Sequence, residues 1–297
     1  MLRPVLVGID GSPEALAAAG WAAREAQRHD VALRLVHAWT RSPHPSALPS
    51  TTSQHHWARR ILREAHDHLG ALYPHLPVEE YAVEGLAPSV LLEALADGAL
   101  LVIGSRSLGG STGYLAGSVA LHLTTRCPTP VVLVRAGEQA EDAHQLNAEG
   151  HSATNTPYRD IVLGVDLAHP SDEAVAFAFE SARSRDAPLR ILHGYRPLPV
   201  TVTATGTGAA VASEVPAEYE AALDALVLPW REKYPETVMT ATARPGRAQS
   251  LLLHAASEAG LLVLGRHNRL RPGPYTGPVI QAATHHARCP IAVVPHA

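Results

Sequence analysis

Apolar positions follow two different periods along the first half of the chain. Four short apolar runs are typical of buried strands: Val5–Ile9, Val31–Ala38, Ala99–Ile103 and Val131–Val134; Val78–Val83 is expected to be a further strand, the third in chain order. Between these runs, apolar residues recur every three or four positions, which predicts amphipathic helices. Their inward faces are expected at Leu16, Ala19, Ala23 and Ala26, at Trp57, Ile61, Ala65 and Leu69, and at Val90, Leu91, Ala94 and Leu95; a last helix is expected over 118–126. This alternation predicts an α/β fold, a five-stranded parallel sheet with helices on both faces.

The second half of the chain repeats the first. Asp10 aligns with Asp166 and His37 with His193, both at an offset of 156 residues, so this segment is expected to be duplicated without a gap. Residues 84–106 align with 245–267 at an offset of 161, and 117–134 align with 277–294 at an offset of 160. The sequence therefore predicts two tandem copies of one domain, with one residue missing from the second copy before Gly277.

A polar stretch without apolar periodicity joins the two copies. It covers residues 138–157, and its composition is typical of a flexible linker. The predicted domains are therefore 1–137 and 158–297, on either side of this linker.

Composition excludes several classes of function. With 24 basic and 28 acidic side chains the formal charge is −4, and there is no basic run to follow a nucleic acid backbone. No apolar run approaches the roughly 20 residues of a membrane-spanning helix. Because no signal or transit peptide precedes the first strand, a cytoplasmic protein is expected. The two cysteines, Cys127 and Cys289, are expected to be reduced thiols.

Candidate ligand-binding residues meet at the carboxyl ends of the predicted strands, where open parallel sheets bind ligands. Asp10 follows the first strand, Ala38 ends the second, and a loop with five glycines, from Gly104 to Gly117, follows the fourth. Glycines let backbone N–H groups approach an anion closely. Ser118 then begins a helix, and a helix N-terminus favours phosphate. The alternative is that the glycines serve only tight turns.

The spacing Gly104-x2-Ser107-x9-Gly117-Ser118 resembles the universal stress protein motif Gly-x2-Gly-x9-Gly-Ser/Thr, with Ser107 in place of the second glycine. The segments GIDGSPEA, LVHAW, LLVIGSR and GSVALHL are also similar to this family. The resemblance covers nearly the whole chain, twice. It implies two tandem Rossmann-like domains of the adenine nucleotide alpha hydrolase-like type, which bind ATP or another adenine nucleotide, with or without Mg²⁺.

The resemblance also implies a binding site in the first copy. Gly8, Asp10 and Ala38 would surround the nucleoside. The ribose and phosphates would be held by residues of the glycine-rich loop and the following helix: Gly104, Ser105, Arg106, Ser107, Leu108, Gly109, Gly110, Gly117, Ser118 and Val119.

Two departures from the motif affect the expected affinity. If the position of Ser107 needs a positive φ, a serine there costs about 1–2 kcal/mol, and Ser107→Gly would tighten binding; if the hydroxyl donates to a phosphate, the same change would weaken it. In the second copy, Gly265-x2-Asn268 is followed by eight residues and then Gly277-Pro278. Proline lacks the N–H and the hydroxyl that Ser118 offers. The second copy is therefore expected to bind nucleotide poorly or not at all, with Asp166 left to cap its turn.

Two other chemistries have weaker support. Residues 109–113, GGSTG, match the G-x-S-x-G pattern of hydrolases, but a nucleophile elbow joins a strand directly to a helix, and the preceding strand ends at Gly104. Three histidine pairs suggest metal ligands: His55-His56, His66-x-His68 and His285-His286. Residues one or two apart on a helix point in different directions, so no metal site is predicted. No catalytic residue is predicted.

The predicted function is a non-enzymatic regulator of the stress response that binds an adenine nucleotide in its first copy and uses the second as a scaffold. Two alternatives remain open. One is an adaptor that acts only through contacts with a protein partner, and the other is a slow ATPase for which Asp10 is the one candidate base.

Assembly is predicted from the last strand of each copy. Val131–Val134 and Ile291–Val294 are expected at sheet edges, which leave backbone groups unpaired. The family resemblance implies that such strands pair across a two-fold axis, so an intramolecular pseudo-dimer is expected, with any homodimer using other surfaces. Proline substitution at Val132 together with Ala292 is expected to uncouple the copies and expose the linker to protease.

Overall fold

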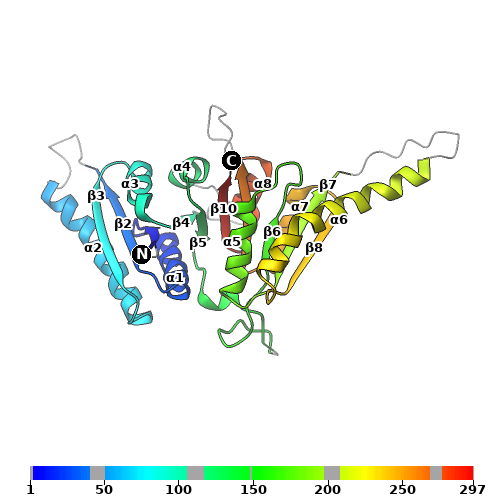
Figure 1. Cartoon of the computed structure of the whole chain (residues 1–297). Helices are drawn as coiled ribbons and strands as arrows, with labels where there is room; N and C mark the ends of the chain where they lie inside the picture. Colours follow the sequence, from blue (N-terminus) through cyan, green and yellow to red (C-terminus); the bar gives the residue numbers. More distant parts are fainter. Residues whose placement is uncertain are drawn as a thin grey trace. The chain divides into compact units, whose positions relative to one another are not determined.

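The computed structural model of the chain describes residues 3–40, 51–105, 117–147, 149–196, 208–267 and 276–296. The chain divides into two compact units, one formed mainly by residues up to Asp142 and the other mainly by residues from Ala143 onward. We call them the first and second unit; they contain the first and second predicted copies (Figure 1).

The first unit is an α/β domain built on a five-stranded sheet. Its strands lie in the order β3-β2-β1-β4-β5, and each pairs with its neighbour in parallel. Because β2 and β4 flank β1, the strand order reverses between β1 and β4. In chain order its elements are β1 (Val5–Gly8), α1 (Pro13–Arg28), β2 (Leu33–Trp39), α2 (Thr51–Leu72), β3 (Val78–Glu84), α3 (Ala87–Ala94), the short 3-10 helix η1 (Leu95–Asp97), β4 (Leu100–Ser105), α4 (Ser118–Arg126), β5 (Val131–Arg135) and η2 (Ala140–Ala143).

The second unit has the same order of elements. Its strands lie in the order β8-β7-β6-β9-β10, and β6 pairs in parallel with both β7 and β9. Its elements are β6 (Ile161–Gly164), α5 (Asp172–Arg183), β7 (Leu189–Tyr195), α6 (Gly208–Lys233), β8 (Met239–Pro245), α7 (Ala248–Ala256), β9 (Leu261–His267), α8 (Pro278–His286) and β10 (Ile291–His296). The prediction of two tandem α/β domains is confirmed.

Helices cover both faces of the first sheet. Helices α1 and α2 pack on one face, and α3 and α4 pack together on the other (Figure 1). The central strands are therefore buried on both sides, which explains their continuous apolar runs: Leu6, Leu101 and Leu133 are fully buried or nearly so. Leu91 of α3 and Leu123 of α4 complete this part of the core.

Most of the predicted inward-facing residues are buried, but Ala94 is half-buried and two others are exposed. Leu16 is 38% exposed, because it lies outside the buried face of α1. That face is formed by alanines, among them Ala15, Ala19, Ala22 and Ala26. Trp57 is 51% exposed, and instead of entering the core its ring makes a T-shaped contact with that of His37. The prediction was wrong at these two positions. None of the helices in the described ranges has the length and apolar character needed to cross a membrane.

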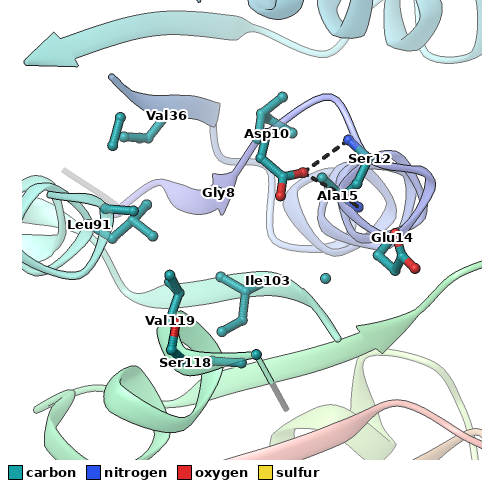
Figure 2. A pocket seen from close by; sticks show the side chains of 16 residues that line it. Gly8, Asp10, Ser12, Glu14, Ala15, Val36, Leu91, Ile103, Ser118 and Val119 are labelled. Atoms are coloured by element: carbon teal, nitrogen blue, oxygen red, sulfur yellow. Dashed lines mark hydrogen bonds between the residues drawn. The ribbon is translucent and has the colours of Figure 1, made fainter. Parts of the chain in front are cut away.

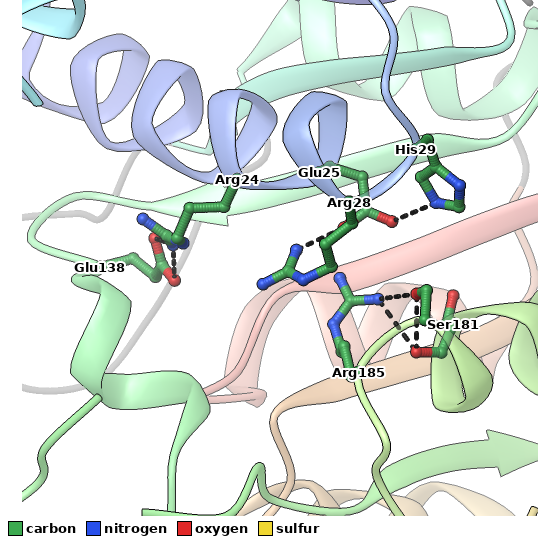
Figure 3. A network of polar contacts seen from close by, with 8 residues as sticks. Arg24, Glu25, Arg28, His29, Glu138, Ser181 and Arg185 are labelled. Carbon is green, nitrogen blue, oxygen red and sulfur yellow. Dashed lines mark hydrogen bonds and ion pairs between the residues drawn. The ribbon is translucent and has the colours of Figure 1, made fainter. Parts of the chain in front are cut away.

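The stretch predicted as a flexible linker is hydrogen-bonded in the structure. It begins at Glu138, whose carboxylate accepts two hydrogen bonds from Arg24 of α1 (Figure 3). After η2, isolated β-bridges join His144 to Tyr158 and Leu146 to Ser152. Polar composition hid these contacts, because they are made by backbone groups and by charges distant in sequence.

The two copies have the same length from the end of their first strand to the start of their second, Gly8 to Leu33 and Gly164 to Leu189, as expected for a duplication without a gap, but their helices begin at different points. Ser12 caps α1 by accepting from the amide of Ala15, and Ser171 caps α5 by accepting from that of Ala174. These serines are 159 positions apart, three more than Asp10 and Asp166. Helix α5 is correspondingly shorter, with 12 residues against 16 in α1. The loop before α5 therefore holds three additional residues.

Candidate functional site

A pocket lies in the first unit where the strand order reverses. Its walls come from the ends of β1, β2 and β4, the first turn of α1, and the beginnings of α3 and α4 (Figure 2). It holds about 840 Å³ of space, including the part open to solvent.

One side of the pocket is apolar. Val36 and Ala38 project from the same face of β2, since side chains alternate along a strand. Leu91 of α3 and Ile103 of β4 face them, and both are buried (Figure 2). Gly8 forms the floor, where a Cβ atom would come within 3.3 Å of Leu91 and 3.4 Å of Ile103. The result is an apolar slot suited to a flat ring.

The other side of the pocket carries a carboxylate in a fixed turn. Oδ1 of Asp10 accepts hydrogen bonds from the backbone N–H of Ser12 at 3.0 Å and from its hydroxyl at 2.5 Å (Figure 2). The hydroxyl oxygen of Ser12 in turn accepts from the amide of Ala15 at the start of α1. A carboxylate offers about four lone-pair sites, so Asp10 can accept ligand hydroxyls in addition to this turn.

Helix α4 begins at the rim of the same pocket. Gly117 is its N-cap with φ −55°, and Ser118 is its exposed first residue. The first N–H groups of a helix have no partner within the helix. Together with the helix dipole, they favour an anion at this end of the pocket.

Gly104 permits a close approach between β4 and α1. A Cβ atom at this position would lie 2.6 Å from the carbonyl carbon of Glu14 and 2.8 Å from the amide nitrogen of Ala15. Both contacts are with backbone, which cannot rotate away. The glycine is therefore required for packing that sets the width of the pocket.

In the second unit, the space that corresponds to the apolar slot of the first unit is narrower. A Cβ atom at Gly164, the counterpart of Gly8, would lie 2.7 Å from Leu252, whereas Leu91 is 3.3 Å from the same point in the first unit. Gly194 replaces Ala38, and a Cβ atom there would lie 2.8 Å from the Cα of Ala248 in α7. Without that methyl group, α7 lies close against β7, which leaves less room for a ring.

In the second unit, histidines lie on the side of the site that carries Asp166, the counterpart of Asp10. The longer loop before α5 carries His169, whose Nδ1 lies 3.3 Å from Oδ2 of Asp166. The ring of His169 contacts that of His267, which contacts that of His296, with centroids 5.5 and 5.0 Å apart. Oδ1 of Asp166 accepts from the amide of Ala168, so this carboxylate caps its own turn.

Helix α8 of the second unit begins with a proline. Gly277 is its N-cap, with φ +82°, and Pro278 is its first residue. Proline suits the first position of a helix, but it removes one of the N–H donors that α4 presents in the first unit.

The model of the universal stress protein family matches this chain twice, over residues 1–135 and 157–295. The chain belongs to the universal stress protein family. Universal stress proteins of Mycolicibacterium smegmatis and Mycobacterium tuberculosis are 27% and 28% identical to it over 305 residues, which cover 98% and 97% of this chain and 96% and 95% of theirs.

Solved structures show the same fold along the whole chain. A protein of unknown function from Pseudomonas aeruginosa gives a TM-score of 0.64 at 14% identity, covering 99% of this chain and 92% of its own. A universal stress protein from Archaeoglobus fulgidus gives a TM-score of 0.61 at 12% identity, covering 99% and 98%. At these identities the likeness concerns the fold alone.

Seven of the sequence-predicted residues line the pocket of this universal stress protein: Gly8, Asp10, Ala38, Gly104, Gly117, Ser118 and Val119. Ser105 does not; it is buried, and its hydroxyl donates to the carbonyl of Val134 in β5. Arg106, Ser107, Leu108, Gly109 and Gly110 lie outside the described residues, as does the GGSTG segment.

Sequence reasoning missed several lining residues of the universal stress protein pocket. Val36 carries a signal that was available, because it lies two positions before Ala38 and shares its side of β2. Ser12 and Glu14 belong to the helix start that the turn sequence already indicated. Leu91 and Ile103 were predicted as core residues, and their role as walls follows only from the three-dimensional arrangement.

The histidine pairs of this universal stress protein lie apart from the pocket. The rings of His55 and His56 have centroids 6.4 Å apart, and those of His285 and His286 are 6.2 Å apart. Across the part of the chain that the structure describes, no three His, Cys, Asp or Glu side chains are grouped as a metal ion requires.

Proposed function

We propose that this universal stress protein is a cytoplasmic regulator that binds ATP or another adenine nucleotide, with or without Mg²⁺, in its first unit. The observation that carries the proposal is one pocket with an apolar slot, a carboxylate and a helix N-terminus in succession. The adenine base favours an apolar slot, the ribose hydroxyls favour a carboxylate that accepts hydrogen bonds, and the phosphate favours a helix N-terminus. The three groups are joined in this same order in the nucleotide.

Each part of the nucleotide would contact a different element. The base would lie between Val36, Leu91 and Ile103, where apolar burial contributes about 25 cal/mol per Å². The ribose hydroxyls would donate to Asp10. The phosphates would lie against the N-terminus of α4, where Ser118 adds a hydroxyl donor to the backbone N–H groups.

We propose a binding function rather than catalysis. Among the residues that the structure describes, the titratable side chains that line the pocket are Asp10 and Glu14. Asp10 already accepts two hydrogen bonds from Ser12, which hold it in the turn as an acceptor. Such a site suits a protein whose conformation or contacts with a protein partner respond to the nucleotide.

A calorimetric titration with ATP is expected to give one site per chain. The first unit would supply it, because in the second unit Leu252 and Ala248 narrow the slot and Pro278 removes a helix N–H donor. Two equal sites would contradict the argument about the second unit. No binding of either ATP or AMP at millimolar concentration would contradict the proposed function.

Gly117→Val is expected to abolish nucleotide binding without unfolding the protein. A Cβ atom at Gly117 meets nothing within 4 Å, and the φ of −55° accepts any side chain. The new side chain would stand at the rim of the pocket beside Ser118, so affinity should fall by at least about tenfold, equivalent to roughly 1.4 kcal/mol. Titration calorimetry and thermal melting together check this result.

The control is Gly277→Val, at the matching position of the second unit. Its φ of +82° makes a valine strained, at a cost of about 1–2 kcal/mol in stability. Nucleotide affinity should stay unchanged although the melting temperature falls. Loss of binding in this control would show that stability, rather than the rim of the first pocket, governs affinity.

A further inference from the structure

The end of β1 is held by two consecutive residues of β2. The sheet pairing of β1 with β2 ends at Gly8 opposite Val36. The next residue, Ile9, donates its amide to the carbonyl of Val36 at 2.9 Å. Its own carbonyl is 2.6 Å from Nδ1 of the following β2 residue, His37. Both polar groups of the Ile9 backbone are therefore fixed immediately before Asp10.

The geometry determines which nitrogen of His37 carries the proton. A carbonyl oxygen can only accept a hydrogen bond, so Nδ1 of His37 must be the donor. Ile9 and His37 are 3% and 4% exposed, so water cannot replace this bond if it is lost. A buried carbonyl without a partner is unfavourable, and the backbone would shift to satisfy it.

His37 does not belong to the wall of the pocket. Val36 and Ala38 line it, and the side chain between them must point to the opposite face of β2. There its ring makes a T-shaped contact with that of Trp57, a residue of α2, at a centroid distance of 5.8 Å. The hydrogen bond to the Ile9 carbonyl therefore links this side chain to Asp10 on the ligand side of the strand.

The second unit contains the same bond. Val165 donates its amide to Leu192 at 3.0 Å, and its carbonyl is 3.0 Å from Nδ1 of His193. His193 is 8% exposed. The residue after Val165 is Asp166, the counterpart of Asp10. The same hydrogen bond therefore occurs in both units, beside the pocket in the first unit and beside the narrower site in the second.

We propose that His37 is the positioning residue for Asp10, which it aims at the ribose hydroxyls by holding the Ile9–Asp10 peptide plane. This inference rests on the proposed function. Rotation of that plane would move the Asp10 carboxylate relative to the slot formed by Val36 and Leu91, while the slot itself would stay in place. His37 therefore governs recognition of the ribose and not of the base.

The test compares AMP with 2′,3′-dideoxy-AMP, which lacks both ribose hydroxyls. The wild-type protein should bind AMP at least about tenfold more tightly, as expected for hydrogen bonds to a charged group. In His37→Phe the Nδ1 donor is absent, so AMP affinity should fall to nearly that of the dideoxy nucleotide. The affinity for 2′,3′-dideoxy-AMP itself should change less than about threefold, since the apolar slot remains.

Two polar substitutions separate the hydrogen bond from the ring. The side-chain nitrogen of asparagine takes the place of Nδ1, whereas that of glutamine takes the place of Nε2. His37→Asn should therefore keep most of the preference for AMP, and His37→Gln should lose it. This pair keeps the test decisive if the phenylalanine variant fails to fold.

His193→Phe is the matched control in the second unit. It removes the equivalent bond and should lower the melting temperature about as much as His37→Phe, while the preference for AMP stays at its wild-type value. If His37→Phe weakens both nucleotides equally, or leaves the preference intact, the inference is overturned and the proposed function stands. If the wild-type protein binds both nucleotides equally, Asp10 has no role toward the ribose and the inference falls. If it binds neither, nor ATP, the proposed function fails first.

Discussion

Gly104→Ala is expected to destabilise the first unit and to abolish nucleotide binding. The added methyl group would come within 2.6–2.8 Å of the backbone of Glu14 and Ala15, so α1 must move away from β4. Overpacking of this kind costs about 1–3 kcal/mol or more. The shift would also displace the Asp10–Ser12 turn, which is joined to the start of α1. Denaturant unfolding followed by circular dichroism, together with calorimetric titration, measures both effects.

The same substitution in the second unit provides the control. A methyl group at Gly265 would lie 3.4 Å from His296 and from the Cβ of Ser171, which is close to ordinary contact. Gly265→Ala should therefore change stability by less than about 1 kcal/mol and leave nucleotide affinity intact. Equal effects of the two substitutions would mean that the close approach of α1 to β4 is not what makes Gly104 necessary.

Arg24→Met is expected to be among the most destabilising single changes in the first unit. Two nitrogen–oxygen contacts of 2.5 and 2.7 Å join Arg24 to Glu138, and their side chains are only 13% and 7% exposed (Figure 3). Removal of one partner leaves the other as an uncompensated buried charge, at a cost of about 3–5 kcal/mol. Denaturant unfolding at neutral pH measures the loss.

Two further variants separate the buried pair from ordinary surface charge. The double variant Arg24→Met with Glu138→Leu should recover most of the stability, because a buried ion pair can often be replaced by apolar side chains. Arg60→Met removes one partner of an exposed pair with Glu64 and should change stability by less than about 1 kcal/mol. A double variant as unstable as Arg24→Met would show that the linker start needs the charges themselves.

The loss in Arg24→Met should depend on pH. Burial raises the pKa of Glu138, and the charge of Arg24 is the largest effect that opposes this rise. Without Arg24 the pKa of Glu138 would rise further above its value in the unfolded chain. Protonation then favours the folded state, so the deficit should shrink as the pH falls through the folded-state pKa and be greatest above it. A deficit that grows on acidification would contradict this account.

The sequence by itself determined the fold and half of the site. Apolar runs such as Ala99–Ile103 can be recognised in the local sequence, because a strand that is buried on both faces accepts few polar residues. The alternation of strands and helices placed Asp10 and Gly104 at the carboxyl ends of strands, where parallel sheets bind ligands, and Ser118 at the start of the helix that follows. These positions follow from order along the chain, and the structure places all three at one pocket.

Alignment of the two copies could not show where their loops differ. Equal spacing of Asp10 to His37 and of Asp166 to His193 concealed a shorter helix, because the loops before and after α5 are longer by three residues and one residue and make up the four that the helix lacks. Only the helix caps, Ser12 and Ser171, revealed the difference.

The tertiary structure alone decided the contacts between residues far apart in sequence. The closeness of α7 to β7 depends on the missing methyl group at Gly194, a difference of one carbon atom that carries no periodic signal. The pairing of Arg24 with Glu138 spans 114 positions, and polar composition predicted a flexible linker where that ion pair fixes the chain. The bond from His37 to Ile9 crosses between neighbouring strands. Periodicity reports which face of an element is buried, whereas distance and direction between elements are set by packing.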